Sequence, residues 1–298
     1  MCGIVGLLVK NPSLRPRLGE LMVPMLIGMT DRGPDSSGMA VFTESVGEGA
    51  RKLSVYCARA GFDWQQLERA FMQSLGEATF ENKVNHCIIK TSVELLVIRE
   101  WLTAKYPDVH LLSVGRSIDL YKDIGLPAEV ADRYGFRHFS GTHLVGHTRM
   151  ATESAVTLEN AHPYTAGEDW CLVHNGSLAN PGSLRRKLEK LGERFESDCD
   201  TEAACRYLHW RLTAGDSLET ALQHAFDDFD GFFTFLMGTR DKLALVRDPF
   251  ACKPAVVAET DEYVAIASEF HSLAHLPGIK HAAVFEPKPA EVYAWSVQ

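Results

Sequence analysis

The sequence predicts an α+β fold of antiparallel sheets that carries a small inserted α/β lobe. Residues 231–296 are nearly all short apolar runs joined by tight turns, which is typical of antiparallel sheet. Between residues 52 and 116, β-like runs alternate with helix-like segments, a pattern that favours a compact α/β unit. We therefore expect one large domain over residues 2–298, with the lobe inserted at residues 50–140.

Each element follows from local pattern. Residues 2–8 predict a strand because CGIVGLL is short, apolar and bounded by glycine, and RGPDSSG at 32–38 has the composition of a loop. In the lobe, strands are expected at 52–60, 84–91 and 109–115, and helices at 63–75 and 92–106. Elsewhere, helices are expected at 17–29, 181–192, 201–213 and 217–228, and strands at 38–42, 144–150, 170–176, 232–238, 242–248, 254–259 and 263–268.

Composition excludes several classes of protein. Hydrophobic residues make up 46% of the chain and charged residues 23%, as in an ordinary globular protein with a real core. The formal net charge is -9 and no basic block occurs, so nucleic-acid binding is not expected. Apolar runs fall far short of the roughly 20 residues of a membrane span, and residues 2–9 lack a basic leader. We expect a cytoplasmic protein without membrane contact.

Cysteines and histidines show no metal-binding pattern. The seven cysteines are dispersed and include no C-x-x-C pair, which favours reduced thiols over a disulfide framework or a zinc site. The histidines, including His86, His110, His143 and His271, also lack ligand spacing. The sequence therefore predicts no bound metal.

Cys2 is the first candidate for chemistry. If the initiator methionine is removed, Cys2 carries a free α-amine beside its own thiol. With a reference pKa of roughly 7.7–8.0, that amine can act as the base for the thiol. Alone, a Met-Cys start is weak evidence, because many chains begin this way by chance.

Motifs spread over nearly the whole chain strengthen this candidate. They are MCGIVG at the start, RGPDSSG at 32–38, GHTRMAT at 146–152, HNGSLAN at 174–180, SDCDTE at 197–202, DGFFTF at 230–235 and RDPFACKP at 247–254. In content and order they resemble the class II glutamine amidotransferases, which are N-terminal-nucleophile hydrolases. The resemblance implies a four-layer αββα sandwich and glutamine as the substrate.

The resemblance also assigns catalytic roles. Cys2 corresponds to the nucleophile, and the Asn175 side chain and Gly176 backbone N–H correspond to the donors that stabilise the oxyanion. Asn-Gly is also a strong hairpin signal, so a tight turn is the structural alternative. The two interpretations are compatible, because a tight turn would expose a backbone amide.

A site that binds free glutamine needs one fixed cation for the α-carboxylate and one fixed anion for the α-ammonium. Arg149 matches the family arginine that binds the α-carboxylate, for which a planar guanidinium is well suited. Asp200 matches the aspartate that holds the α-ammonium; the alternatives are a helix N-cap and, for the ligand role, nearby Asp198. Arg32 resembles the family arginine that helps order the part of the site holding the nucleophile. The alternative is an arginine in a surface loop. Thr152, in the arginine motif, completes the substrate-binding set.

Two departures from the family pattern indicate which members of the family this chain resembles most. Hexosamine-forming relatives often read A-T-H-G after the arginine motif, whereas here TRMATES lacks that histidine and is nearer to glutamate-synthase-like members. The gap between RGPDSSG and GHTR is also longer than in compact members. The chain looks most like the glutaminase-like subunit of N-methylglutamate synthase and related complexes. Since those complexes carry flavin on another subunit, the resemblance implies no cofactor here. It implies two partners, a flavin-containing synthase subunit and a further glutamate-synthase-like subunit.

Two other functions stay open on the sequence. The chain could be a non-catalytic structural subunit of such a complex that uses external amine. It could also be a stand-alone hydrolase of another γ-glutamyl amide.

Overall fold

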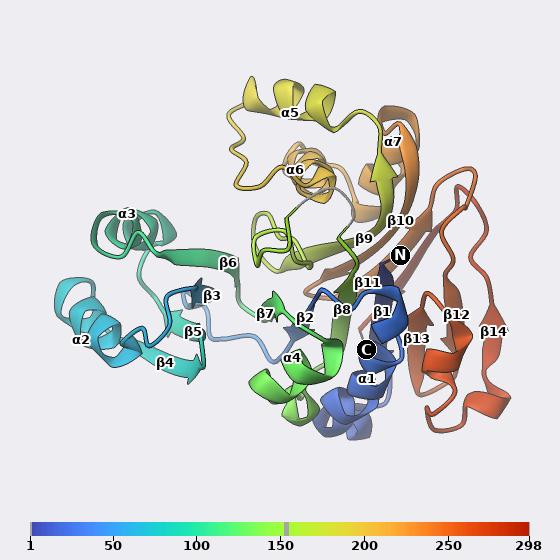
Figure 1. Cartoon of the computed structure of the whole chain (residues 1–298), viewed down its shortest axis with the longest axis horizontal. Helices are drawn as coiled ribbons and strands as arrows, with labels where there is room; N and C mark the ends of the chain where they lie inside the picture. The colour runs from blue at the N-terminus through green and yellow to red at the C-terminus, as the bar shows by residue number, and fades with distance from the viewer. Residues whose placement is uncertain (1, 152–154, 298) are drawn as a thin grey trace.

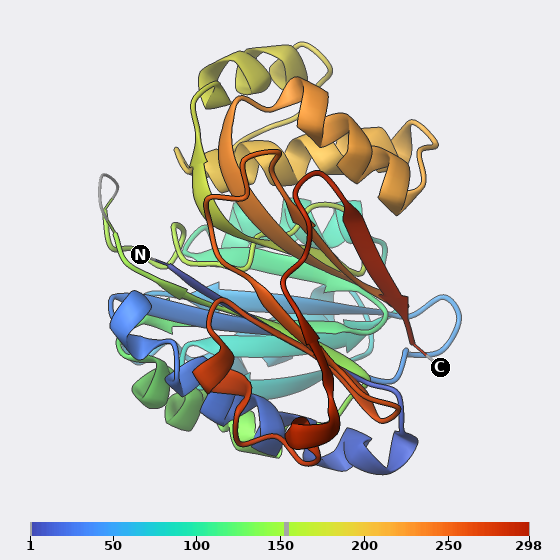
Figure 2. The same ribbon diagram turned by 90° about the vertical axis from the view of Figure 1, so that its right-hand side faces the viewer.

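The computed structural model describes residues 2–151 and 155–297. Two β-sheets lie face to face, and each is covered by helices on its outer side, as Figures 1 and 2 show. This arrangement is the predicted α+β, four-layer αββα sandwich. The apolar residues between the sheets include Ile4, Leu8 and Val145 of one sheet and Val173 and Leu236 of the other. Burying each such side chain stabilises the fold by about 1.5–3 kcal/mol.

The first sheet has seven strands in the order β14-β12-β13-β1-β8-β2-β7, and all its neighbours are antiparallel. Its strands are β1 (Gly3–Val9), β2 (Ser36–Phe42), β7 (Ile118–Ile124), β8 (His143–Arg149), β12 (Val256–Glu259), β13 (Tyr263–Ala267) and β14 (Ala283–Phe285). β1 confirms the strand predicted at 2–8. β2 begins at Ser36, so the second half of the predicted loop 32–38 is already strand.

The second sheet has four antiparallel strands in the order β15-β11-β10-β9. They are β9 (Trp170–Leu178), β10 (Gly231–Thr239), β11 (Lys242–Arg247) and β15 (Val292–Ser296). The antiparallel arrangement predicted for residues 231–296 is confirmed in both sheets. β9 is the last strand of its sheet, so it has a strand neighbour on one side only.

Helices close both outer faces. α1 and α4 lie on the first sheet, while α5, α6 and α7 cover the second (Figure 1). The α-helices outside the lobe are α1 (Leu18–Ile27), α4 (Pro127–Tyr134), α5 (Pro181–Glu189), α6 (Asp200–Thr213) and α7 (Leu218–Asp228). Short 3-10 helices are η1 (Pro12–Arg17), η2 (Thr30–Arg32), η3 (Phe136–His138), η4 (Phe270–Leu273) and η5 (Ile279–His281). None of the helices in the described ranges is long and apolar enough to cross a membrane.

The inserted lobe has its own sheet and core. Its strands run in the order β4-β5-β3-β6, and two helices pack on one face of the sheet. The elements are β3 (Arg51–Cys57), α2 (Trp64–Ser74), β4 (Ala78–Lys83), β5 (His86–Thr91), α3 (Leu95–Lys105) and β6 (Val109–Gly115). This βαββαβ order is the ferredoxin-like arrangement. The sheet is therefore antiparallel, and strand β4, which was not among the predicted strands, completes it.

The lobe is shorter than the predicted range of 50–140. β7 pairs with β2 along its full length and α4 packs against α1, so residues 118–134 belong to the large domain. Lys52 of the lobe forms an ion pair with Asp119 of β7 at 2.6 Å, and the Ser54 hydroxyl accepts a hydrogen bond from the Leu120 N–H at 2.9 Å. The lobe thus covers the outer edge of β7 with polar contacts.

Candidate active site

Strand pairing places Cys2 beside the arginine motif. Gly3 pairs with Thr148 of β8, and Arg149 is the next residue along that strand. A Cβ atom on Gly3 would lie 2.7 Å from Met29 and from the Thr148 hydroxyl, so only glycine permits this approach. The Cys2 Sγ atom lies 3.9 Å from the Met150 carbonyl oxygen. The nucleophile candidate therefore sits at the end of β1, next to Arg149.

Arg32 holds the backbone of Cys2. Its Nε atom donates a hydrogen bond to the Cys2 carbonyl oxygen at 3.0 Å, and its guanidinium forms a 2.6 Å ion pair with Glu269. The surface-loop alternative for Arg32 does not hold, because its side chain is only 10% exposed. Glu269 was missed in the sequence, where it is one acidic residue after a strand.

Arg149 ends β8 and is buried, with its Nη1 atom 3.3 Å from the Ala155 carbonyl oxygen. Asp35 holds the backbone of residues 149–151 in place. Its N–H donates to the Arg149 carbonyl, and its carboxylate accepts from the Ala151 N–H at 2.8 Å. The predicted substrate-binding residue Thr152 lies outside the described residues.

Asn175 and Gly176 lie inside β9, where they pair with Thr234 and Phe233 of β10. The hairpin alternative for Asn-Gly is therefore wrong. Asn175 is 2% exposed, and its Nδ2 donor has no hydrogen-bond partner among the described residues. At Gly176, with φ +156°, a Cβ atom would lie 1.9 Å from the Phe232 carbonyl oxygen, so no other residue fits.

The outer edge of β9, away from β10, carries a ladder of contacts. Leu172 exchanges backbone hydrogen bonds with Tyr164, at 2.9 and 2.8 Å. Two residues on, the His174 N–H donates to His162 Nδ1. Four residues further, the Leu178 N–H donates to Asp200 at 2.8 Å. Because backbone groups alternate sides along a strand, the Gly176 N–H between them points to this same edge.

Asp200 is the first residue of α6, and the N-cap of that helix is Cys199, so the N-cap alternative for Asp200 is wrong. One carboxylate oxygen of Asp200 accepts from Leu178, and the other lies 3.7 Å from His174 Nδ1. Burial alone would raise the pKa of Asp200, but contacts with His174, the Leu178 N–H and Thr201 outweigh it and hold the pKa below its ordinary value. Asp200 is thus an anion at neutral pH, with its side chain still 24% exposed.

His147 connects the two sheets at the level of the site. Its Nε2 atom lies 3.0 Å from the carbonyl oxygen of His174, the residue before Asn175. His147 itself pairs with Ile4, two residues after Cys2. The contact therefore brings β9, which carries Asn175, alongside β1, the strand that follows Cys2.

Several other histidines and cysteines are buried and pack in the hydrophobic core. Burial lowers the pKa of His143 to about 4, and its ring stacks on Phe42. Burial likewise raises the pKa of Cys87 and of Cys171 to about 12. In residues 2–151 and 155–297, no group of three or more His, Cys, Asp or Glu side chains is placed to hold a metal ion.

A cavity of about 510 Å³ borders the site. It lies between the segment after Arg149 and the segment before Asp200, and exposed Asp198 is part of its wall. Its lining residues are Ala155, Thr157, Glu159, Asn160, Glu196, Ser197 and Asp198. Arg149 contacts this wall through the Ala155 carbonyl oxygen at 3.3 Å, and Asp200 follows the lining residue Asp198 by two positions.

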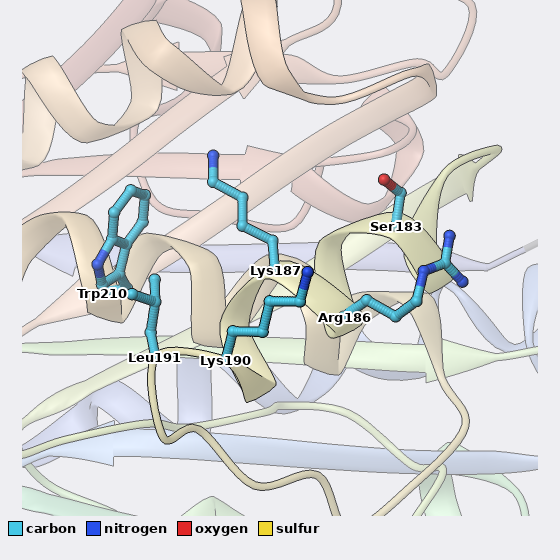
Figure 3. A pocket seen from close by; sticks show the side chains of 6 residues that line it. All are labelled: Ser183, Arg186, Lys187, Lys190, Leu191 and Trp210. Carbon is cyan, nitrogen blue, oxygen red and sulfur yellow. The ribbon is translucent and has the colours of Figure 1, made fainter.

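A second cavity, of about 560 Å³, lies on the outer face of α5 against Trp210 of α6 (Figure 3). The lining residues are Ser183, Arg186, Lys187, Lys190, Leu191 and Trp210. No predicted site residue is among them. Because its charged side chains are all cationic, this cavity does not match the paired charges of an amino acid.

Comparison with solved structures defines the class of fold. Glutamine phosphoribosylpyrophosphate amidotransferase from B. subtilis superposes with a TM-score of 0.62 at 16% identity, covering 98% of this chain and 47% of that one. A structure of the allosteric regulatory enzyme of purine biosynthesis gives a TM-score of 0.64 at 17% identity, covering 98% and 46%. The fold is that of class II, N-terminal-nucleophile amidotransferases. This chain spans about half the length of these two proteins.

Sequence relatives then give the family. A model described as a glutamine amidotransferase domain matches residues 147–275. The glutamine amidotransferase-like protein GlxB of Rhizobium meliloti is 48% identical, covering 100% of this chain and 99% of that protein. A putative glutamine amidotransferase of Methanothermobacter thermautotrophicus is 32% identical, covering 98% and 99%. The chain belongs to the glutamine amidotransferase family.

Proposed function

We propose that this chain hydrolyses the side-chain amide of glutamine through a thioester on Cys2 and supplies the ammonia to a partner synthase. The observation that carries the proposal is the Asn175 side chain, whose buried Nδ2 donor has no partner in the described part of the chain. A buried donor without a partner costs about 1–3 kcal/mol of stability. An oxyanion that forms during the reaction would accept from it.

The proposed chemistry uses the α-amine of Cys2 as base. The amine takes the thiol proton as sulfur attacks the amide carbon, and the oxyanion accepts hydrogen bonds from Asn175 and Gly176. The intermediate collapses, the C–N bond breaks, and the amine returns the proton so that ammonia leaves. Water then hydrolyses the thioester, giving glutamate and the free thiol. Arg32 keeps Cys2 in place by donating a hydrogen bond to the Cys2 carbonyl oxygen.

We propose that Arg149 and Asp200 bind the α-carboxylate and α-ammonium of glutamine. Arg149→Ala and Asp200→Asn are then expected to raise KM by the equivalent of about 2–4 kcal/mol, because each leaves a charged ligand group unpaired. Steady-state kinetics with glutamine measures this. Asp198→Asn tests the alternative ligand, since exposed Asp198 lies in the cavity wall two residues from Asp200, and its effect on KM should be much smaller. Equal effects of the two aspartate changes would contradict the assignment.

We further propose that the lobe docks a flavin-containing subunit of an N-methylglutamate-synthase or glutamate-synthase-like complex, together with a further subunit of that complex. Helix α3 exposes Leu96 (67%) and Val97 (45%) on the lobe surface. The lobe also reaches the site, because the Tyr56 hydroxyl donates to Glu159, which lines the cavity beside Arg149. A partner on the lobe can therefore bias the arrangement of the glutamine site.

Glutamate release tests the function and the partnership together. The purified chain, with an intact mass that shows loss of Met1, is expected to release glutamate slowly alone and roughly 5–150-fold faster with the captured synthase subunit. Leu96→Glu should weaken this stimulation, whereas Val284→Glu, at an exposed site of the first sheet, should not.

Each alternative function has its own outcome in this assay. Full activity alone, with no stable partner, would favour a stand-alone hydrolase. A complex that uses free amine and ignores glutamine would favour a structural subunit.

A further inference from the structure

Two buried histidines hold the backbone of His174, the residue before Asn175. The His174 N–H donates to His162 Nδ1 at 3.4 Å, and the His174 carbonyl accepts from His147 Nε2 at 3.0 Å. The two imidazoles stack on each other, with ring centroids 4.0 Å apart and planes at 28°. Both side chains are at least nine-tenths buried, with His147 0% and His162 4% exposed.

These contacts occupy the edge of β9 that no strand covers. Buried backbone groups must find partners, and an unpaired one costs about 1–3 kcal/mol. Side chains supply those partners at His174 and Leu178, on either side of the Gly176 N–H. The position and direction of that N–H therefore depend on what holds its two neighbours.

The hydrogen bonds fix the protonation of both rings. A carbonyl only accepts, so His147 must carry its proton on Nε2. An N–H only donates, so Nδ1 of His162 must be bare, and its proton lies on Nε2, which is 3.9 Å from Cys199 Sγ. Burial agrees with two neutral rings, since it lowers the pKa of His147 to about 3 and that of His162 well below its ordinary value.

We propose that His147 and His162 are positioning residues for the oxyanion donors, which they aim by holding the His174 backbone between them. This inference rests on the proposed glutaminase function. The two rings do not contact the reacting atoms; they act through the strand that carries Asn175 and Gly176. Donors of this kind work only when preorganised, and a displacement of about 1 Å can cost roughly 10²-fold in rate.

Paired substitutions in the full chain test the inference. His147→Leu and His162→Leu remove the two hydrogen bonds, and kcat for glutamine should fall about 10–100-fold while KM stays within about threefold. His147→Gln restores a donor at the Nε2 position and His162→Asn an acceptor at the Nδ1 position, so both should recover most of kcat. Thermal unfolding of all four variants shows which are folded.

Nuclear magnetic resonance of the ¹⁵N-labelled imidazoles gives a readout independent of turnover, and both rings should be Nε2–H tautomers. The inference is overturned if either ring is the Nδ1–H tautomer, if the leucine variants keep kcat, or if glutamine and asparagine rescue no better than leucine. If wild-type chain with the predicted tautomers releases no glutamate even with its partner, the proposed function fails and the inference falls with it, while the histidine contacts stand.

Discussion

Cys2→Ser is expected to abolish glutamate release, with a loss of at least roughly 10³-fold in kcat, while the fold is retained. A serine hydroxyl is a far weaker nucleophile than a thiol beside the same amine. The fold should persist because Cys2 precedes β1, and the hydrogen bond from Arg32 reaches its backbone carbonyl, which serine keeps. We expect the free energy of unfolding to change by less than about 1 kcal/mol. Glutamine turnover and thermal unfolding of the two proteins measure these effects.

The other thiols provide the control. A glutamine-mimicking diazoketone should label Cys2 alone, and glutamine should protect it. Cys252 is exposed, so an ordinary alkylating reagent should modify it as well. Cys252→Ser should keep full turnover. Diazoketone labelling at Cys199 or Cys252 would move the nucleophile away from β1 and overturn the assignment.

Most of the sandwich could be predicted, because its strands are short, apolar and bounded by turns. Strand β7 is not predictable from its own residues, since IDLYKDI carries charges that usually mark a surface segment. In the folded chain those charged side chains are buried or half-buried, and they have partners. Asp119 pairs with Lys52, and the Lys122 ammonium donates to the Ala161 carbonyl at 2.7 Å. Such pairing joins residues far apart in sequence, so no local pattern reports it.

The topology of the lobe could not be predicted from the sequence either. Alternating strands and helices were visible, but β4 reads as a polar edge segment, with no residue of ATFENK fully buried. Without β4, the order of elements looks like a simple α/β alternation. With it, the βαββαβ order requires an antiparallel sheet. One short, exposed strand therefore decides the topology of the whole lobe.

The candidate site was predictable only where motifs carry it. Cys2, Arg149, Asn175 and Gly176 stand out in the sequence because several motifs occur in a fixed order. The residues that support them do not, because each comes from a distant segment with no pattern of its own. Glu269, which pairs with Arg32, is such a residue. His162, which holds β9, is another.

Asn175→Ala is expected to lower kcat by roughly 10²–10³, equivalent to about 2.7–4 kcal/mol, with little change in KM, because the lost donor acts on charge that develops only in the transition state. The free energy of unfolding, in contrast to kcat, should not fall. Nδ2 has no partner in residues 2–151 and 155–297, so removing it takes away a buried polar group and leaves the free energy of unfolding equal or higher.

Asn180 of the same motif is the matched control, because its amide is paired with the Asp228 carbonyl at 3.1 Å and with the Asp230 N–H at 3.2 Å. Asn180→Ala should cost about 0.5–1.5 kcal/mol of stability for each hydrogen bond lost and leave kcat nearly unchanged. Kinetics and denaturant unfolding of both variants separate the two roles. If Asn175→Ala destabilised the chain and kept its kcat, Asn175 would be a structural residue, and the oxyanion would have to be stabilised elsewhere.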